Sequence, residues 1–171
     1  MHRDLPKVLK NFTAFVDGNA YLGKVTELEP PKLKLKMNGH RAGSMDAEIK
    51  IDMGMEPLEA TATFAEYTPD LFKKFGILSG DDVMVTFRGA VRRNGAEAEA
   101  VIIDILGTFE EMDPGSWKAG DDSSLKVKIA INYYQLEIAG EELIEIDVPN
   151  SIRKIDGVDQ LESVRTALGI K

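Results

Sequence analysis

Alternating apolar and polar residues run through most of the chain and predict strands that have one covered face and one open face. The two best-patterned stretches are residues 32–37, KLKLKM, and residues 48–53, EIKIDM. Ten residues separate them, of which nine, Asn38–Asp46, are the predicted loop, although two residues are enough to close a hairpin. We therefore expect two antiparallel strands, each with a buried apolar face, joined by a long polar loop that protrudes at residues 38–46.

The charged side chains of these two arms form the other predicted face. They are Lys32, Lys34, Lys36, Glu48, Lys50 and Asp52. In one antiparallel register Lys36 lies opposite Glu48. The same register puts Lys32 opposite Asp52. Cross-strand pairs of this kind contribute a few tenths to about 1 kcal/mol each, so they help to set the register more than the stability.

Further strands are predicted by the same alternation and by turn residues. They lie in residues 12–25 (two short strands around Asp17-Gly18-Asn19), 59–67, 83–91, 97–109, 125–138 and 143–148. The pair Asn94-Gly95 predicts a type I′ turn. A shift of the apolar phase by one residue near Tyr133-Tyr134 predicts a β-bulge. Residues 110–124 predict a loop of fifteen residues, a length typical of functional loops.

Two segments carry helix signals. In residues 67–78, Thr68 is a candidate N-cap and Gly76 a candidate stop. In residues 157–171, Asp159 is the candidate N-cap.

Because helices do not alternate with the strands along the chain, the pattern predicts a mainly β fold of antiparallel sheets. We expect two packed antiparallel sheets, sandwich- or barrel-like, with one flanking helix and a short C-terminal helix. The chain has 171 residues, of which 43 % are hydrophobic and 29 % charged. This composition is that of one globular domain, residues 1–171, with the hairpin loop protruding from it.

The charge balance and the absence of cysteine exclude several classes of function. A net charge of −8 disfavours nonspecific binding to nucleic acid or to anionic lipid. Without cysteine the chain has no disulfide, no thiolate zinc site and no cysteine nucleophile. The first residues lack the apolar core of a signal peptide, and no apolar run is long enough for a bilayer. We expect a soluble protein made in the cytoplasm, without a membrane anchor.

Candidate chemistry is sparse. His2 and His40 are the only histidines, which is a poor set of metal ligands. The many carboxylates lie at turns and on polar faces, where solvated surface is the favoured interpretation. We therefore predict no catalytic, metal or cofactor-binding residue and no enzyme. Two alternatives stay open: a monomeric ligand-binding β-barrel that uses Trp117, Tyr133 and Tyr134, and a hydrolase with a buried carboxylate pair.

Four collinear blocks of the chain resemble the major tail tube proteins of contractile-tail bacteriophages and of R-type bacteriocins, the tailocins. They are Pro31–Glu56, with R-x-G-x-M-D at Arg41–Asp46; Glu111–Asp121, EMDPGSWKAGD; Tyr133–Val148; and Ile155–Ile170. Together they span nearly the whole chain.

The resemblance implies a structural subunit that forms hexameric rings, which stack into a tube inside a contractile sheath. It implies that inner strands join those of neighbouring subunits around a lumen, and that the long loop reaches the adjacent ring. The implied contact loop consists of Asn38, Gly39, His40, Arg41, Ala42, Gly43, Ser44, Met45 and Asp46. The charged arm residues named above are the candidate polar face of the barrel strands.

The implied partners are further copies of the chain, the tail sheath protein, and the baseplate and tail terminator proteins. A tape measure protein or transiting DNA is implied for the lumen, and the virion tail or tailocin particle for the location. In a phage the tube would conduct DNA, and in a tailocin it would perforate the target envelope. A tube protein of a related contractile secretion system is the remaining alternative within this fold.

Overall fold

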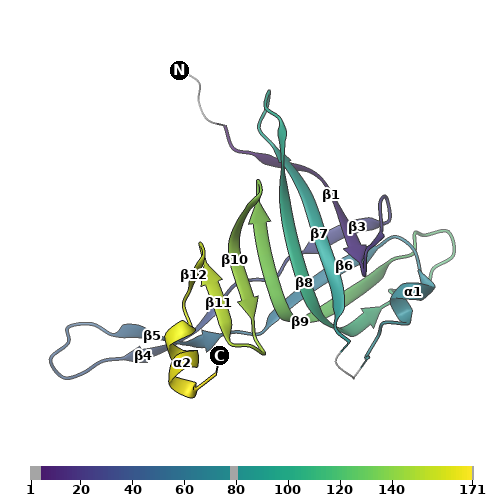
Figure 1. Cartoon of the computed structure of the whole chain (residues 1–171). Coiled ribbons are helices and arrows are strands. Elements are labelled where there is room, and N and C mark those ends of the chain that lie inside the picture. Colours follow the sequence, from purple (N-terminus) through teal and green to yellow (C-terminus); the bar gives the residue numbers. More distant parts are fainter. Residues whose placement is uncertain (1–4, 78–80, 171) are drawn as a thin grey trace.

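The computed structural model describes residues 5–77 and 81–170 and confirms a mainly β fold (Figure 1). Its strands are β1 (Val8–Val16), β2 (Asn19–Ala20), β3 (Val25–Glu29), β4 (Leu35–His40), β5 (Ile49–Met55), β6 (Leu58–Phe64), β7 (Val83–Arg92), β8 (Ala98–Asp113), β9 (Leu125–Ile138), β10 (Glu141–Asp147), β11 (Ile152–Ile155) and β12 (Val158–Asp159). Its helices are α1 (Pro69–Phe72) and α2 (Glu162–Leu168). The strands form two antiparallel sheets, as expected.

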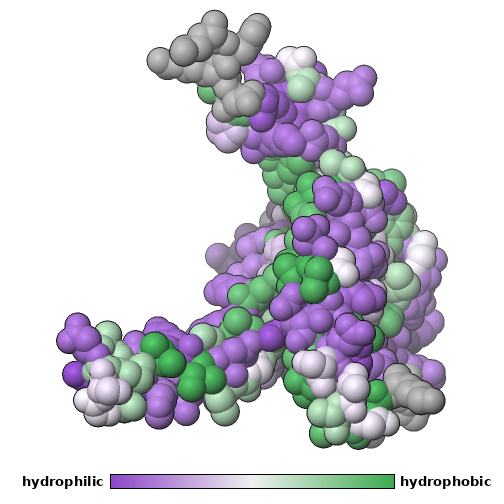
Figure 2. All heavy atoms as spheres, turned by 60° about the vertical axis from the view of Figure 1, so that its left-hand side comes forward, coloured by the Kyte–Doolittle hydropathy of each residue, from purple (hydrophilic) through white to green (hydrophobic). Residues whose placement is uncertain are grey.

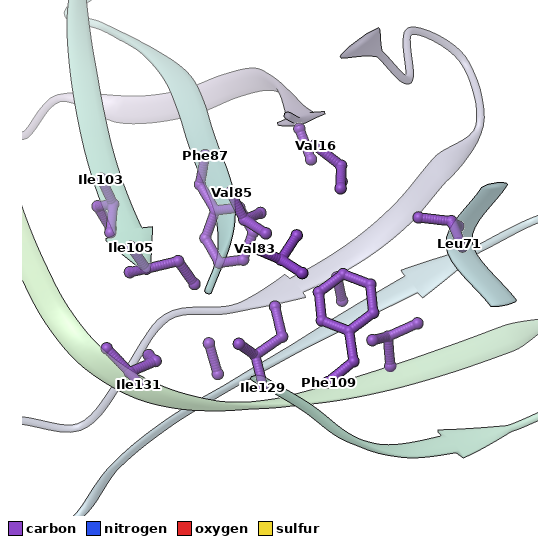
Figure 3. Close-up of a cluster of buried hydrophobic side chains, with 14 of the residues drawn as sticks. Val16, Leu71, Val83, Val85, Phe87, Ile103, Ile105, Phe109, Ile129 and Ile131 are labelled. Atoms are coloured by element: carbon purple, nitrogen blue, oxygen red, sulfur yellow. The ribbon is translucent and has the colours of Figure 1, made fainter. Parts of the chain in front are cut away.

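The strand β9 joins two layers of the larger sheet. The main path runs β12-β11-β10-β9-β8-β7-β1-β2, and β6 and β3 branch from it. The first half of β9, Leu125–Ile131, pairs with β6, whereas its second half, Tyr133–Ile138, pairs with β10. The long strands β8 and β9 thereby cross from one layer to the other, and the sheet folds over its own core (Figures 1 and 3).

A bulge at the middle of β9 produces this bend. Leu106 pairs with Tyr133, but Gly107 pairs with Ile131, so Asn132 is the extra residue. The bulge predicted near Tyr133-Tyr134 is confirmed. At this place β8 comes so close to β9 that a Cβ atom on Gly107 would lie 2.1 Å from the Ala130 carbonyl oxygen.

The substitution Gly107→Ala is expected to destabilise the fold strongly, because the added methyl group meets the backbone, which cannot rotate away. Overpacking of a tight site costs about 1–3 kcal/mol, and we expect about 3 kcal/mol here. Urea unfolding monitored by circular dichroism measures this loss. The matched control is Gly43→Ala, where nothing lies within 4 Å of the new Cβ. Equal stability of the two variants would contradict the close approach.

The core lies between the two layers (Figure 3). Val85 of β7 and Ile105 of β8 come from one side, Phe109 of β8 and Ile129 of β9 from the other, and all are 0–1 % exposed. Leu71 of α1 points into the same cluster and is fully buried. Apolar alternation identified these strands correctly, since each contributes every second residue to the core.

The turn at Asp17-Gly18 closes a hairpin as predicted, but the return strand β2 has only two residues. The next strand, β3, starts at Val25 and pairs with β6, not with β1. The turn at Asn94-Gly95 is confirmed, although its type is not. A type I′ turn requires positive φ at both central residues, and of the two only Gly95 has it.

The predicted loop at residues 110–124 is too long by four residues. Residues 111–113 continue β8, because they pair with residues 128–126 of β9. The loop is therefore residues 114–124. The polar sequence of 110–113 concealed this continuation, since the outer face of a strand accepts charged residues as readily as a loop does.

The first helix is shorter than predicted for residues 67–78, and Leu78 lies outside the described residues. Pro69 takes the first helical position, and Thr68 is the N-cap residue, but its side chain makes no capping hydrogen bond. Only Leu71 of the helix is buried. One buried side chain gives the helix too little packing to extend it.

The second helix starts later than predicted for residues 157–171, of which Lys171 lies outside the described residues. Val158 and Asp159 form β12, and Leu161 is the N-cap residue. The Asp159 carboxylate still serves this helix, because it accepts a hydrogen bond from the Leu161 N–H (3.0 Å). Gly169, with φ +72°, ends the helix in the left-handed conformation.

Candidate assembly surface

The strands β4 and β5 form a two-stranded ribbon, residues 35–55, which extends away from the rest of the molecule (Figure 1). Within the described residues these two strands pair only with each other. The ribbon continues the β3–β6 pair, since β4 follows β3 and β5 precedes β6. It is thus the outer half of one long hairpin, interrupted by Pro30-Pro31 on one side and Pro57 on the other.

Apolar side chains of the two arms are largely uncovered. Their exposed fractions are 42 % for Leu33, 40 % for Leu35, 44 % for Met37, 51 % for Ile49, 44 % for Ile51 and 58 % for Met53. The prediction that each arm has a buried apolar face is therefore wrong for the single subunit. The alternating pattern is typical of a strand with one buried face, but the rest of the described chain leaves these apolar side chains largely uncovered.

The apolar rows of the two arms lie on opposite faces of the ribbon. Met37 pairs with Asp52, and Asn38 pairs with Ile51. Residues directly opposite in an antiparallel pair share a face, so each face carries one apolar and one polar row. The cause is an extra residue at Gly54, which has φ +103° and shifts the register by one. Figure 2 shows hydrophilic and hydrophobic residues side by side along this arm.

The predicted cross-strand ion pairs do not form. Asp52 lies opposite Met37 instead of Lys32, and Glu48 lies beyond the last pair of the ladder, His40–Ile49, instead of facing Lys36. The Glu48 side chain covers Gly39, where a Cβ would come within 2.1 Å of its carboxylate oxygen. The position of the loop accounts for this difference: the ladder closes at His40–Ile49, further along the chain than the predicted register assumed, and the bulge at Gly54 shifts the register by only one residue.

The loop predicted as a contact begins later than expected, because Asn38, Gly39 and His40 belong to β4. The remaining predicted residues, Arg41–Asp46, lie in the loop at residues 41–48, together with Ala47 and Glu48. The loop has internal order. The Met45 N–H donates to the Ala42 carbonyl (3.0 Å), and Arg41 Nε donates to the Met45 carbonyl (3.2 Å). The polar tip is thus a shaped turn at the end of the ribbon.

Two further predicted polar residues lie at the base of the ribbon, whereas Lys36 lies within β4 and Lys50 pairs with Gly39 near the tip. Lys32 and Lys34 precede β4 and line a hollow together with Glu56, Glu59 and Lys128. Lys128 pairs with Glu59 (3.3 Å) and with Glu110 (3.2 Å), and these carboxylates raise its pKa. Lysines and acids therefore mix here, and the base of the ribbon is not a basic patch.

An ion pair fastens the ribbon to the C-terminal strands. The guanidinium of Arg153 in β11 lies 2.7 Å from the Asp52 carboxylate. The Gly54 N–H and the Arg153 guanidinium together lower the pKa of Asp52. The two residues are 101 positions apart. Sequence reasoning missed Arg153, since only the fold brings it to the ribbon.

A second ion pair holds α2 to β11 and β12. The guanidinium of Arg165 lies 2.6 Å from the Asp159 carboxylate, and both side chains are less than one-fifth exposed. Arg165 also donates to the Ser151 carbonyl (2.8 Å). The Arg165 guanidinium, and after it the Leu161 N–H, lower the pKa of Asp159 to about 2.

Asp159→Asn is expected to reduce the free energy of unfolding near neutral pH, by an amount that shrinks in acid. The Asp159 pKa is lower in the folded protein than in the unfolded chain. Its ionised form therefore stabilises the fold above about pH 4, and this contribution is lost as the pH falls through about 2. Urea unfolding of both proteins at about pH 6 and about pH 2 measures it. Asp156→Asn, in the neighbouring turn, is the matched control. A wild-type advantage independent of pH would contradict the assignment.

The aromatic residues considered for ligand binding have separate environments. Tyr134 is buried in the core, and the Tyr133 hydroxyl donates to Glu145 (3.2 Å). Burial and the Glu145 charge raise the pKa of Tyr133 to about 12. Trp117 is 83 % exposed, and its Nε1 donates to the Tyr67 hydroxyl (3.0 Å). Tyr134 is thus buried and Tyr133 only half-buried, as alternation along a strand produces.

The two histidines do not form a metal site within the described residues. His2 lies outside the described residues, and His40 pairs with Ile49 in the exposed ribbon. Across residues 5–77 and 81–170, no group of three histidines or carboxylates is arranged to hold a metal ion. The same residues include no helix long and apolar enough to cross a membrane.

Comparisons with known proteins identify the family of the chain. Residues 6–169 match the family described as phage tail tube protein FII. The chain is 31 % identical over 173 residues to the tail tube protein of Escherichia phage P2, covering 97 % of this chain and 99 % of that one. It is 30 % identical over 169 residues to the major tail tube protein of Serratia phage KSP20, covering 97 % and 98 %.

Among solved structures, the fold resembles the sheath/tube terminator of an extracellular contractile injection system, PVC, in its extended state. The TM-score is 0.62 at 10 % identity, over 78 % of this chain and 98 % of that one, which is a likeness of fold alone. The family match confirms the expected recognition and, with it, the role of a structural tail tube protein instead of an enzyme. On the strength of a match along nearly its whole length, the chain belongs to the phage tail tube protein FII family.

Proposed function

We propose that six copies of this chain form a ring, that the rings stack into the inner tube of a contractile tail, and that the ribbon makes the contact between neighbouring rings. The observation that carries the proposal is the ribbon itself, whose apolar rows are about half exposed on both faces. A two-stranded hairpin is only marginally stable in water, so a persistent exposed ribbon calls for a partner surface.

The ends of the larger sheet support assembly through strand edges. Among the described residues β2, β3 and β12 each pair on one side only. Free edges invite pairing with another chain, and a head-to-tail pairing that closes on itself generates a ring. A ring would therefore cover strand edges that the single subunit leaves open.

The charge of the chain suits a conduit for DNA. A basic lining would bind phosphate and arrest transit, whereas this chain carries a net charge of −8. In this proposal a sheath surrounds the tube, terminator and baseplate proteins cap its ends, and a tape measure protein or DNA occupies the lumen. In a tailocin the same tube would perforate the target envelope, and the presence or absence of a capsid gene nearby distinguishes the two.

Negative-stain electron microscopy and sedimentation of the concentrated protein test the proposal. Rings with sixfold symmetry and tubes of uniform width are the expected result, with sheath and terminator proteins added if nucleation requires them. A species that stays monomeric at every concentration, also with those partners present, would overturn it. Rings of another symmetry would contradict the proposed number of six subunits but would still agree with a tube of stacked rings.

A further inference from the structure

A second projection, here called the tongue, lies at the other end of the molecule. It consists of residues 5–12 and 88–100, where β1, the end of β7 and the start of β8 run together (Figure 1, top). The last pair between β8 and β9 is Val101–Ile138, so residues 90–100 extend past the cover of β9, and Arg88 lies at the base of the tongue, opposite Ile102. Figure 2 shows the tongue and the ribbon as two arms of a C-shaped molecule.

The surface of the tongue is apolar and basic. Its exposed apolar residues are Leu5 (54 %), Val8 (53 %), Leu9 (52 %) and Phe12 (37 %). It carries five basic residues and two acidic ones, a net charge of +3 in a chain of net charge −8. Lys7 pairs with Glu99 at 2.5 Å, whereas Lys10 and Arg88 are exposed and form no ion pair with any described residue.

The opposite end of β8 has the complementary character. Residues 110–124 contain five acidic residues and one lysine, a net charge of −4. Glu111 and Asp122 are exposed, and neither has an ion-pair partner in the described part of the chain. The same segment holds Trp117, the single tryptophan, which is 83 % exposed. Exposed tryptophan is enriched at the centres of protein interfaces.

We propose that the tongue of one copy docks on the acidic end of another copy, residues 110–124, with Trp117 against the tongue's apolar side chains. This deepens the proposed function and rests on it. The two surfaces differ and lie at opposite ends of β8, so the contact is head to tail and propagates from copy to copy. It assigns assembly roles to Lys10 and Arg88 on one copy and to Glu111 and Asp122 on the next.

Complementary charge favours a second copy over nucleic acid as the occupant. The +3 of the tongue meets −4 on the acidic end, and opposite patches steer association and set its register. Nucleic acid on the tongue would meet a chain that is acidic elsewhere, and the acidic end with its exposed tryptophan would stay uncovered.

Trp117 fluorescence and paired charge reversals test the contact. In tubes of the wild-type protein we expect Trp117 emission to shift to shorter wavelength and its quenching by acrylamide to fall several-fold. The double variant K10E/R88E is expected to lose at least about tenfold in assembly, as is E111K/D122K. The four changes together restore opposite charges and are expected to recover assembly. Circular dichroism and thermal unfolding show that each variant is folded.

The outcomes separate this inference from the proposed function. Tubes in which Trp117 stays as exposed as in the monomer would overturn the docking but leave the tube intact. So would normal assembly of K10E/R88E, or a quadruple variant that is folded but gains nothing over the doubles. Tongue-dependent binding of DNA without the effect on assembly would point to nucleic acid and also overturn it. A strictly monomeric wild type would overturn both.

Discussion

A variant in which Asn-Gly replaces residues 41–48 is expected to fold normally and to form no tubes. The Asn-Gly turn joins His40 to Ile49, which already lie opposite each other in the ribbon. Asn-Gly is the preferred sequence of a two-residue type I′ turn, so the shortened ribbon closes without strain. The loop contributes nothing to the buried core, and thermal unfolding should therefore stay within a few degrees of wild type.

The loss in assembly follows from removing the tip that is proposed to touch the next ring. Each subunit would lose the Arg41–Met45 turn, and a loss of about 1.4 kcal/mol per contact already weakens association about tenfold. In a ring every subunit loses the contact at once, so stacking would fail as a whole. Sedimentation gives the tube fraction, and microscopy shows whether unstacked rings remain.

The control for this variant is Gly43→Ala, which keeps the loop and adds one methyl group in open space. We expect it to assemble like the wild type. Rings without tubes in the deletion variant would assign the loop to contacts between rings. Monomers only would assign it to contacts within a ring and correct that part of the proposal. Normal tubes would show that the loop makes no essential contact.

The strands of this fold could be predicted from the sequence, because the alternation of apolar and polar residues indicates which side chains are buried in the core. Val85 and Ile129 lie on the apolar faces of the predicted strands 83–91 and 125–138, and both are buried. The helix at residues 67–78 was overpredicted because capping residues mark where a helix starts, whereas its length depends on packing. With Leu71 alone in the core, the helix ends at Phe72.

The assembly surface could be predicted only in part. The ribbon and its polar tip follow from the pattern of residues 32–53, but the placement of its apolar rows does not. One extra residue at Gly54 moves Met37 and Ile51 to opposite faces, and the glycine was the only local signal of it. The Asp52–Arg153 pair joins segments 101 residues apart, and no periodicity connects them. The tongue was missed because residues 5–12 read as a terminus instead of the beginning of β1.

Phe109→Ala is expected to produce the largest loss of stability among the substitutions considered. The ring is 1 % exposed and lies in the cluster of Figure 3, between the two layers of the sheet. Truncating a buried phenylalanine to alanine costs about 3–5 kcal/mol, through lost burial and the cavity left behind. Single domains have about 5–15 kcal/mol in total, so this loss is a large fraction of the free energy of unfolding. Urea unfolding followed by circular dichroism measures the difference.

The matched control is Phe75→Ala, because the Phe75 side chain is 54 % exposed although its backbone bridges to Phe109. We expect a loss below about 1 kcal/mol there. Only folded subunits enter the tube. Tube formation should therefore raise the apparent stability of Phe109→Ala as the protein concentration increases. A variant that is defective at low concentration and recovers in tubes would show that the core and the assembly surface stabilise the subunit independently. An equal loss in the two phenylalanine variants would contradict the core assignment.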